Sequence, residues 1–161
     1  MLRQSFSAVQ WRVFVVTVLV VWYGGNDRRT SASNIVSALL ITPQTPPETV
    51  VQLQLEALQK DDMETVYQFA SPSNKQAMGP VIRFSEMVRS PPYDPLIHHS
   101  RASVMMTMAY RVNRWQCLVR VWDTEDSGPP KDFVWHMSKS KKDDLYFDCW
   151  MVDAVLPVHN W

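Results

Sequence analysis

The sequence predicts an α+β domain, with short N-terminal helices packed on a curved, four-stranded, mainly antiparallel sheet. Two observations predict this class. Apolar residues repeat at helical spacing between residues 46 and 90, and prolines separate the helical stretches. From residue 101 onward the chain is rich in β-branched and aromatic residues, and turn sequences divide it into strand-length pieces. Helices followed by antiparallel strands are typical of helices on one face of a sheet.

The composition indicates one folded domain, residues 45–161, preceded by a separate segment, residues 1–44. The chain has 161 residues, of which 46% are hydrophobic and 20% charged, enough for one core but not for two domains. Sixteen basic and sixteen acidic side chains cancel, so no overall charge attracts phosphate backbones, and nucleic acid is not a predicted partner. The common phosphate-loop and metalloprotease motifs are missing, and no cofactor is predicted.

Residues 1–44 read as a targeting segment that is largely disordered. The apolar run at residues 13–23 has the length of a signal-peptide core and falls short of the ~20 residues that span a bilayer. The stretch behind it contains arginines, serines and threonines, with Asp27 as its only acid before Glu48. This combination predicts import into a plastid (chloroplast) through an extra membrane. The alternatives are secretion and an uncleaved N-terminal membrane anchor.

The helical half is divided by capping residues and prolines. Thr45 is expected to cap the first helix, whose apolar stripe includes Val51, Leu55 and Leu58. Ser73 is expected to cap a short third helical segment. Helices are predicted over residues 46–60, 63–70, 74–79 and 81–90.

The second half predicts four strands, over residues 101–112, 114–123, 133–140 and 145–156. Alternation places side chains two apart on one face. The sets expected to share a face are Val104, Met106, Met108 and Tyr110 in the first strand, Cys117, Val119 and Val121 in the second, and Phe133, Trp135 and Met137 in the third. The last strand carries bulky residues on both faces, so both are expected to be covered.

Cys117 and Cys149 are predicted to be buried, free thiols. Each is flanked by apolar or aromatic residues in a predicted strand. They belong to the second and fourth strands, and the third strand would hold them too far apart for a disulfide bond. Free thiols suit a reducing compartment.

Three stretches of the chain form a distinctive pattern: residues 47–72, 79–96 and 149–155. Its most distinctive elements are Phe69 to Pro72, Arg83 to Val88, Pro92-Tyr93 and Trp150 to Val155. Over residues 46 to 158 or so, the chain therefore resembles an uncharacterised domain family of bacteria and plastid-bearing eukaryotes, which is similar to nuclear transport factor 2-like (SnoaL-like, cystatin-like cone) proteins. The resemblance implies a cone of helices in the concavity of a bent sheet, with a pocket at the open end. It implies no single reaction, because the superfamily includes isomerases, dehydratases, cyclases, transport adaptors and dimerisation modules.

An enzyme of this cone type would need a buried acid or base facing a hydrogen-bond donor. The candidates for the acid or base are Asp153, Asp148 and His136. Tyr67, Tyr93, Tyr110 and Trp135 are the candidates for lining a ligand pocket, and the three tyrosines for the donor. The parity of the last strand directs Asp153 inward, where the alternative to catalysis is a structural bond to the backbone or to an arginine such as Arg83. His136 is expected to face solvent or a partner.

Other conspicuous residues favour structural roles. The neighbouring His98 and His99 diverge and lack nearby ligands, so no metal site is predicted. Ser71 has no histidine near it in sequence and reads as a cap or turn residue, not a nucleophile. The tryptophans favour core and interface positions over base stacking.

Two classes of function stay open. The first is a non-catalytic module of a plastid that binds a small apolar ligand, a second copy of itself or another protein through the sheet face. The alternative is a small cone enzyme, of isomerase, dehydratase or cyclase type, that uses an inward carboxylate for proton transfer. An unpaired Asp153 or Asp148 at the floor of a deep pocket would favour the enzyme.

Overall fold

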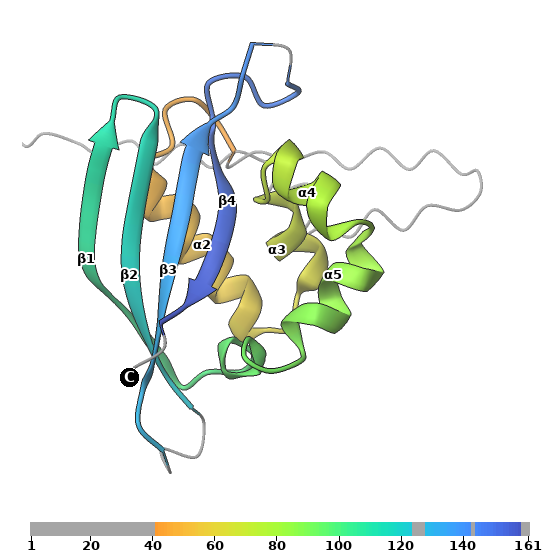
Figure 1. Ribbon diagram of the computed structural model, residues 1–161, viewed down its shortest axis with the longest axis vertical. Coiled ribbons are helices and arrows are strands. Elements are labelled where there is room, and N and C mark those ends of the chain that lie inside the picture. Colours follow the sequence, from red (N-terminus) through yellow and green to blue (C-terminus); the bar gives the residue numbers. More distant parts are fainter. Residues whose placement is uncertain (1–40, 124–127, 143, 159–161) are drawn as a thin grey trace, which may run out of the picture.

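The computed structural model describes residues 41–123, 128–142 and 144–158 (Figure 1). Most of the predicted targeting segment, residues 1–40, therefore lies outside the described residues. Four helices and a 3-10 turn come first: α2 (Pro47–Gln59), α3 (Met63–Gln68), α4 (Pro72–Met78), α5 (Val81–Val88) and η1 (Asp94–Leu96), counted within the described ranges. The strands follow: β1 (Arg101–Arg111), β2 (Arg114–Trp122), β3 (Lys131–Lys139) and β4 (Trp150–Pro157).

The strands form one open antiparallel sheet in the order β1-β2-β3-β4. The helix α2 crosses one face of this sheet, and α3, α4 and α5 stand beside the β4 edge (Figure 1). The predicted α+β class, with short helices on a four-stranded antiparallel sheet, is confirmed.

The core lies between α2 and the central strands. Every second residue of β2 and β3 is buried, which confirms the expected faces: Cys117, Val119, Val121, Phe133, Trp135 and Met137. The apolar stripe of α2 packs against them through Val51, Leu55 and Leu58. The pattern could be predicted because a sheet covered on one face buries alternate side chains.

Two expected helix caps are wrong. The α2 helix is preceded by Pro46, which makes no side-chain cap, and the Thr45 hydroxyl instead hydrogen-bonds that of Thr42 at 2.8 Å. Ser71, not Ser73, caps α4, because its Oγ accepts the Asn74 backbone N–H at 3.2 Å. The fixed φ of proline suits the first helical position, so α4 begins directly at the residue after Ser71.

A register shift in β1 separates residues that were expected to lie on one face of this strand. Val104 pairs with Val119 on the helix side, but Met106 pairs with Leu118, so the extra residue Met105 shifts the register. Met106 and Met108 therefore lie on the opposite face from Val104, and the sequence alternation is wrong here. The strand is exposed along most of its length.

The last strand starts later than expected. Residues 145–148 form a turn in which Asp148 adopts a left-handed conformation, with φ 59°. In β4 itself a further register shift leaves Asp153 between the paired residues Val152 and Ala154. The consecutive residues Met151 and Val152 are both buried, so both faces are covered at this point, as expected. Farther along the strand the expectation is wrong, since Leu156 is 48% exposed.

Both cysteines are buried and free, as predicted. Cys117 pairs in register with Trp135 of β3, which confirms that the third strand separates β2 from β4. Within the described ranges, no helix is long and apolar enough to cross a membrane.

Candidate functional site

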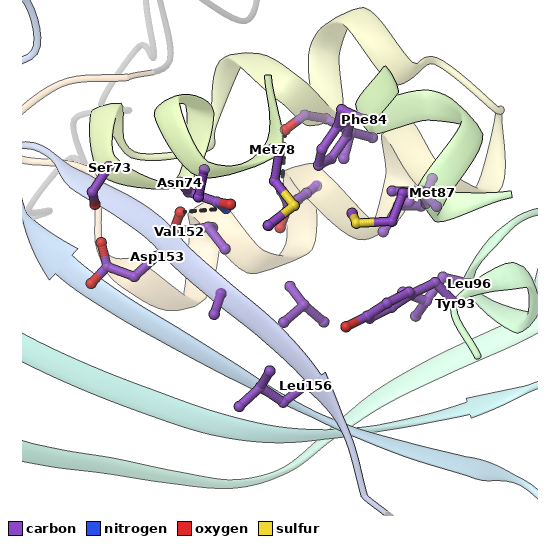
Figure 2. Close-up of a pocket in the computed structure, with 17 residues that line it drawn as sticks. Ser73, Asn74, Met78, Phe84, Met87, Tyr93, Leu96, Val152, Asp153 and Leu156 are labelled. Atoms are coloured by element: carbon purple, nitrogen blue, oxygen red, sulfur yellow. Dashed lines mark hydrogen bonds between the residues drawn. The ribbon is translucent and has the colours of Figure 1, made fainter. Parts of the chain in front are cut away.

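A cavity of about 290 Å³ lies between the helices and the β4 edge of the sheet. Figure 2 shows α4 and α5 on one side of it and β4 on the other. Its lining is mostly apolar and consists of Gln54, Leu58, Val66, Ser73, Asn74, Ala77, Met78, Phe84, Met87, Val88, Tyr93, Leu96 and residues 152–156.

One residue of β4 fixes the position of α4 beside the sheet. The Val152 carbonyl accepts the Ser71 backbone N–H at 2.8 Å and the Asn74 side-chain amide at 3.1 Å, and its N–H donates to the Phe69 carbonyl at 2.9 Å. These bonds close the edge of the strand at Val152. Beyond it, residues 153–156 border the cavity instead of another strand.

Gln54 forms a polar bridge at the base of the cavity. Its side chain is buried, and its Oε1 accepts the Trp135 indole N–H at 2.7 Å. Its Nε2 donates to the Val66 carbonyl at 3.1 Å. The bridge ties α2 to α3, two walls of the cavity, and to β3 behind them.

Tyr93 is the one predicted pocket tyrosine that lines this cavity. Its ring stacks on Phe133 with a centroid separation of 6.4 Å and an interplanar angle of 28°. In Figure 2 the hydroxyl oxygen points toward the middle of the cavity. No hydrogen bond joins this hydroxyl to another residue in the described part of the chain.

Asp153 lines the cavity at the opposite end from Tyr93, near Ser73 (Figure 2). Its Oδ2 forms an ion pair with Arg114 Nη1 at 3.0 Å. Arg114 precedes the buried Trp115 on β2, which places it on the sheet face away from the helices. The carboxylate is therefore a structural partner of an arginine, though of Arg114 and not of Arg83.

The other two acid or base candidates lie elsewhere. Asp148 is in the turn before β4, where its Oδ1 and Oδ2 accept from Lys139 Nζ at 3.1 Å. His136 lies on the sheet face away from the helices, in register with Gln116 and Ala154. Neither residue borders the cavity.

The remaining pocket candidates are held by the scaffold. Tyr67 packs on Phe84 with a centroid separation of 5.3 Å, and its hydroxyl donates to the Gly79 carbonyl at 2.7 Å. Trp135 is fully buried behind Gln54. Tyr110 is exposed on β1. Of the sequence candidates, only Tyr93 and Asp153 border the cavity, at its opposite ends. Whether any candidate contacts a ligand stays a prediction.

Several lining residues were missed by the sequence reasoning. Gln54 carried a usable signal, since it is a polar residue on the apolar stripe that holds Val51, Leu55 and Leu58. Met78 and Met87 carried none, because an apolar residue on a helix gives the same pattern whether it faces a cavity or a packed core.

The two buried cysteine thiols are held in their protonated form. Burial raises the pKa of the Cys117 thiol to about 12, with a further contribution from the charge of Glu48. Burial likewise raises the pKa of Cys149. Both thiols stay protonated and are poor nucleophiles. The described residues contain no cluster of His, Cys, Asp and Glu suited to a metal ion.

Comparison with known proteins identifies the family. Residues 42–159 match the family described as Domain of unknown function (DUF4864). No curated protein and no solved structure matches the chain. The match spans most of the sequence and includes every element that lines the cavity. The chain therefore belongs to the DUF4864 family.

Proposed function

We propose that this domain is a non-catalytic module that binds a small apolar ligand in the cavity between α5 and β4. The observation that carries the proposal is the cavity itself, with its mostly apolar lining and a volume of about 290 Å³. Small-molecule sites typically measure roughly 300 to 1,000 Å³ and combine apolar walls with a few polar groups. The size supports a compact ligand.

The ion pair of Asp153 favours a binding module over an enzyme. A general base needs a carboxylate that is free to take up a proton from a bound substrate. Asp153 is instead engaged by Arg114 at 3.0 Å, and its side chain lies at the end of the cavity away from Tyr93 (Figure 2). Among the described residues, no second acid and no histidine lines the cavity.

Native mass spectrometry of the full chain, expressed in its source organism, tests the proposal. We expect a copurifying small molecule. Ala77→Phe should remove it, because Ala77 is exposed and borders the cavity. Gln76→Phe is the matched control: this neighbour in α4 is also exposed but does not border the cavity, and the bound mass should persist. Equal occupancy in both variants would place the ligand elsewhere.

A second candidate function is self-association through the sheet face that no described helix covers. Four apolar side chains lie in register across this face, one on each strand: Met106, Leu118, Val134 and Leu156. Met106 is 58% and Leu156 48% exposed. An apolar row can meet the same row of a second copy across a two-fold axis, so we propose a homodimer as its partner.

Analytical ultracentrifugation separates this candidate from a monomer. Leu118→Glu should shift the chain toward the monomer mass, because it places a charge in the middle of the row. Leu145→Glu is the control, since Leu145 is 89% exposed in the turn before β4. A chain that is monomeric before any substitution would exclude the dimer.

We also propose that the domain is a nuclear transport factor 2-like cone. The helix α2 on one face of the antiparallel sheet, with α3 to α5 beside the β4 edge and a cavity at their junction, supports this fold (Figure 1). The strand order of an experimental structure tests it.

We further propose that the protein is imported into a plastid. The apolar run and the acid-poor stretch of residues 1–44 support this location. A fluorescent fusion to these residues should accumulate in plastids, and uptake by the secretory pathway alone would contradict import.

A further inference from the structure

We infer that the ligand is not an anion and carries a hydrogen-bond acceptor, such as a carbonyl oxygen, that the Tyr93 hydroxyl binds. The inference rests on the proposed function, because it concerns the chemistry of the same cavity. Its basis is the contrast between Tyr93 and the other polar groups around the ligand space.

The other polar side chains of the cavity have partners within the fold. Gln54 bonds Trp135 and Val66, Asn74 bonds Val152, and Asp153 pairs with Arg114. The Ser73 hydroxyl lies 2.9 Å from that of Ser71. Tyr93 differs, since its hydroxyl has no such partner in the described part of the chain and points into the space (Figure 2).

Tyr93 is fixed in place before any ligand arrives. Its ring rests on the buried Phe133, and its backbone N–H donates to the Ser90 carbonyl at 2.9 Å. Its carbonyl accepts the Leu96 N–H at 2.9 Å, which holds the η1 turn. A side chain fixed in this way loses little conformational entropy on binding, so its hydrogen bond contributes more of its energy to affinity.

The charge of the lining argues against an anionic ligand. In the described part of the chain, no lysine, arginine or histidine borders the cavity, and the only charged group there is the carboxylate of Asp153. An anion moved from water into such a space would lose its hydration and gain no opposite charge. A neutral hydrogen-bond acceptor loses less hydration energy than an anion, and the Tyr93 hydroxyl can donate a hydrogen bond to it.

Three probes of nearly equal shape test the inference: acetophenone, isopropylbenzene and benzoate. They have the same number of non-hydrogen atoms and represent a neutral acceptor, an apolar compound and an anion. The full chain is labelled with ¹³C at the methionine methyl groups, and each probe is titrated by NMR. Met78 and Met87 border the cavity and report binding there, whereas the buried Met63 and Met137 report the integrity of the fold.

Tyr93→Phe should weaken acetophenone about three- to tenfold, the range that one neutral hydrogen bond accounts for. Isopropylbenzene should bind the variant as well as the parent or better, and benzoate should bind the parent more weakly than acetophenone. Tyr67→Phe is the matched control, because its hydroxyl bonds Gly79 outside the cavity, and it should leave the acetophenone affinity unchanged.

The outcomes separate the two claims. If acetophenone and isopropylbenzene both shift Met78 and Met87 but Tyr93→Phe changes neither affinity, the inference about Tyr93 is wrong and the binding cavity stands. Benzoate binding as tightly as acetophenone would overturn the exclusion of an anionic ligand. If none of the probes shifts these two signals, the proposed function fails and the inference fails with it.

Discussion

Gln54 shows how one polar residue organises the core beneath the cavity. It is buried on the apolar face of α2 and connects that helix to β3 through Trp135 and to α3 through Val66. A buried polar group is tolerated only when its bonds are made, because an unsatisfied donor or acceptor loses its hydration without compensation. The position therefore requires a side chain that both donates and accepts.

Gln54→Met should lower the free energy of unfolding by about 1–3 kcal/mol, because it keeps the length of the side chain but leaves the Trp135 N–H unsatisfied. Urea denaturation measures the change. Gln52→Met is the control, since Gln52 is exposed on the same helix, and it should change the stability by less than ~0.5 kcal/mol. Equal effects at both positions would show that the bridge contributes nothing.

The Cys117 thiol predicts a loss of stability in alkali. Burial raises its pKa from 9.0 to about 12, so the folded chain keeps a proton that the unfolded chain releases. The stabilisation is complete below about pH 9 and is lost as the pH rises toward about 12.

Urea midpoints at about pH 8 and about pH 10 should therefore differ more for the parent than for Cys117→Ala. At the lower pH the thiol of the parent should react with a disulfide reagent only after unfolding. Rapid labelling of Cys117 in the folded chain would contradict its burial.

At the scale of elements, the Ser71 cap connects α4 to the cavity. Ser71 Oγ accepts the Asn74 N–H at 3.2 Å, and Asn74 in turn holds Val152 of β4. Ser71→Ala should cost about 0.5–2 kcal/mol in unfolding free energy, as loss of an N-cap does. Thermal unfolding measures it. Ser73→Ala should cost less, because Ser73 caps no helix; the reverse order would reject the assigned cap.

The helices and central strands could be predicted because their signals are local. Prolines follow closely after α3, α4 and α5, and the alternation of β2 and β3 identifies their buried faces. The register shifts in β1 and β4 could not be predicted, since no residue type marks Met105 or Asp153 as an insertion. Each shift reverses the alternation beyond it, so the predicted faces of the two edge strands were the least accurate part.

The cavity depended on packing that a sequence pattern does not encode. Its walls come from the consecutive elements α2, α3, α4, α5 and η1, and from β4, which follows only after three other strands. Tyr93 was predicted as a pocket residue because an enzyme of the cone type would need a hydrogen-bond donor that faces its acid or base. Tyr67 was predicted as a pocket residue on the same grounds, but its hydroxyl donates to the Gly79 carbonyl. Only the folded structure shows which of the two hydroxyls already has a partner.

At the scale of the whole molecule, the stability of the domain depends on where the chain begins. Ile41 is 6% exposed and belongs to the core, and its carbonyl lies 3.8 Å from the Cys149 sulfur. A chain that begins at Ile41 should melt cooperatively with nearly the stability of the full chain. A chain that begins at Thr45 should lose about 1.5–3 kcal/mol, because it lacks this buried side chain. Equal stabilities would show that the contact is dispensable.

The central claim is that the space between α5 and β4 is an open, apolar binding site. A crystal structure of the full chain with isopropylbenzene bound tests it most directly. We expect density for the compound enclosed by Phe84, Met87 and Val155, with the hydrogen bonds of Gln54 unchanged. A space closed by side chains in other rotamers, with the compound bound only at the sheet face, would contradict the claim.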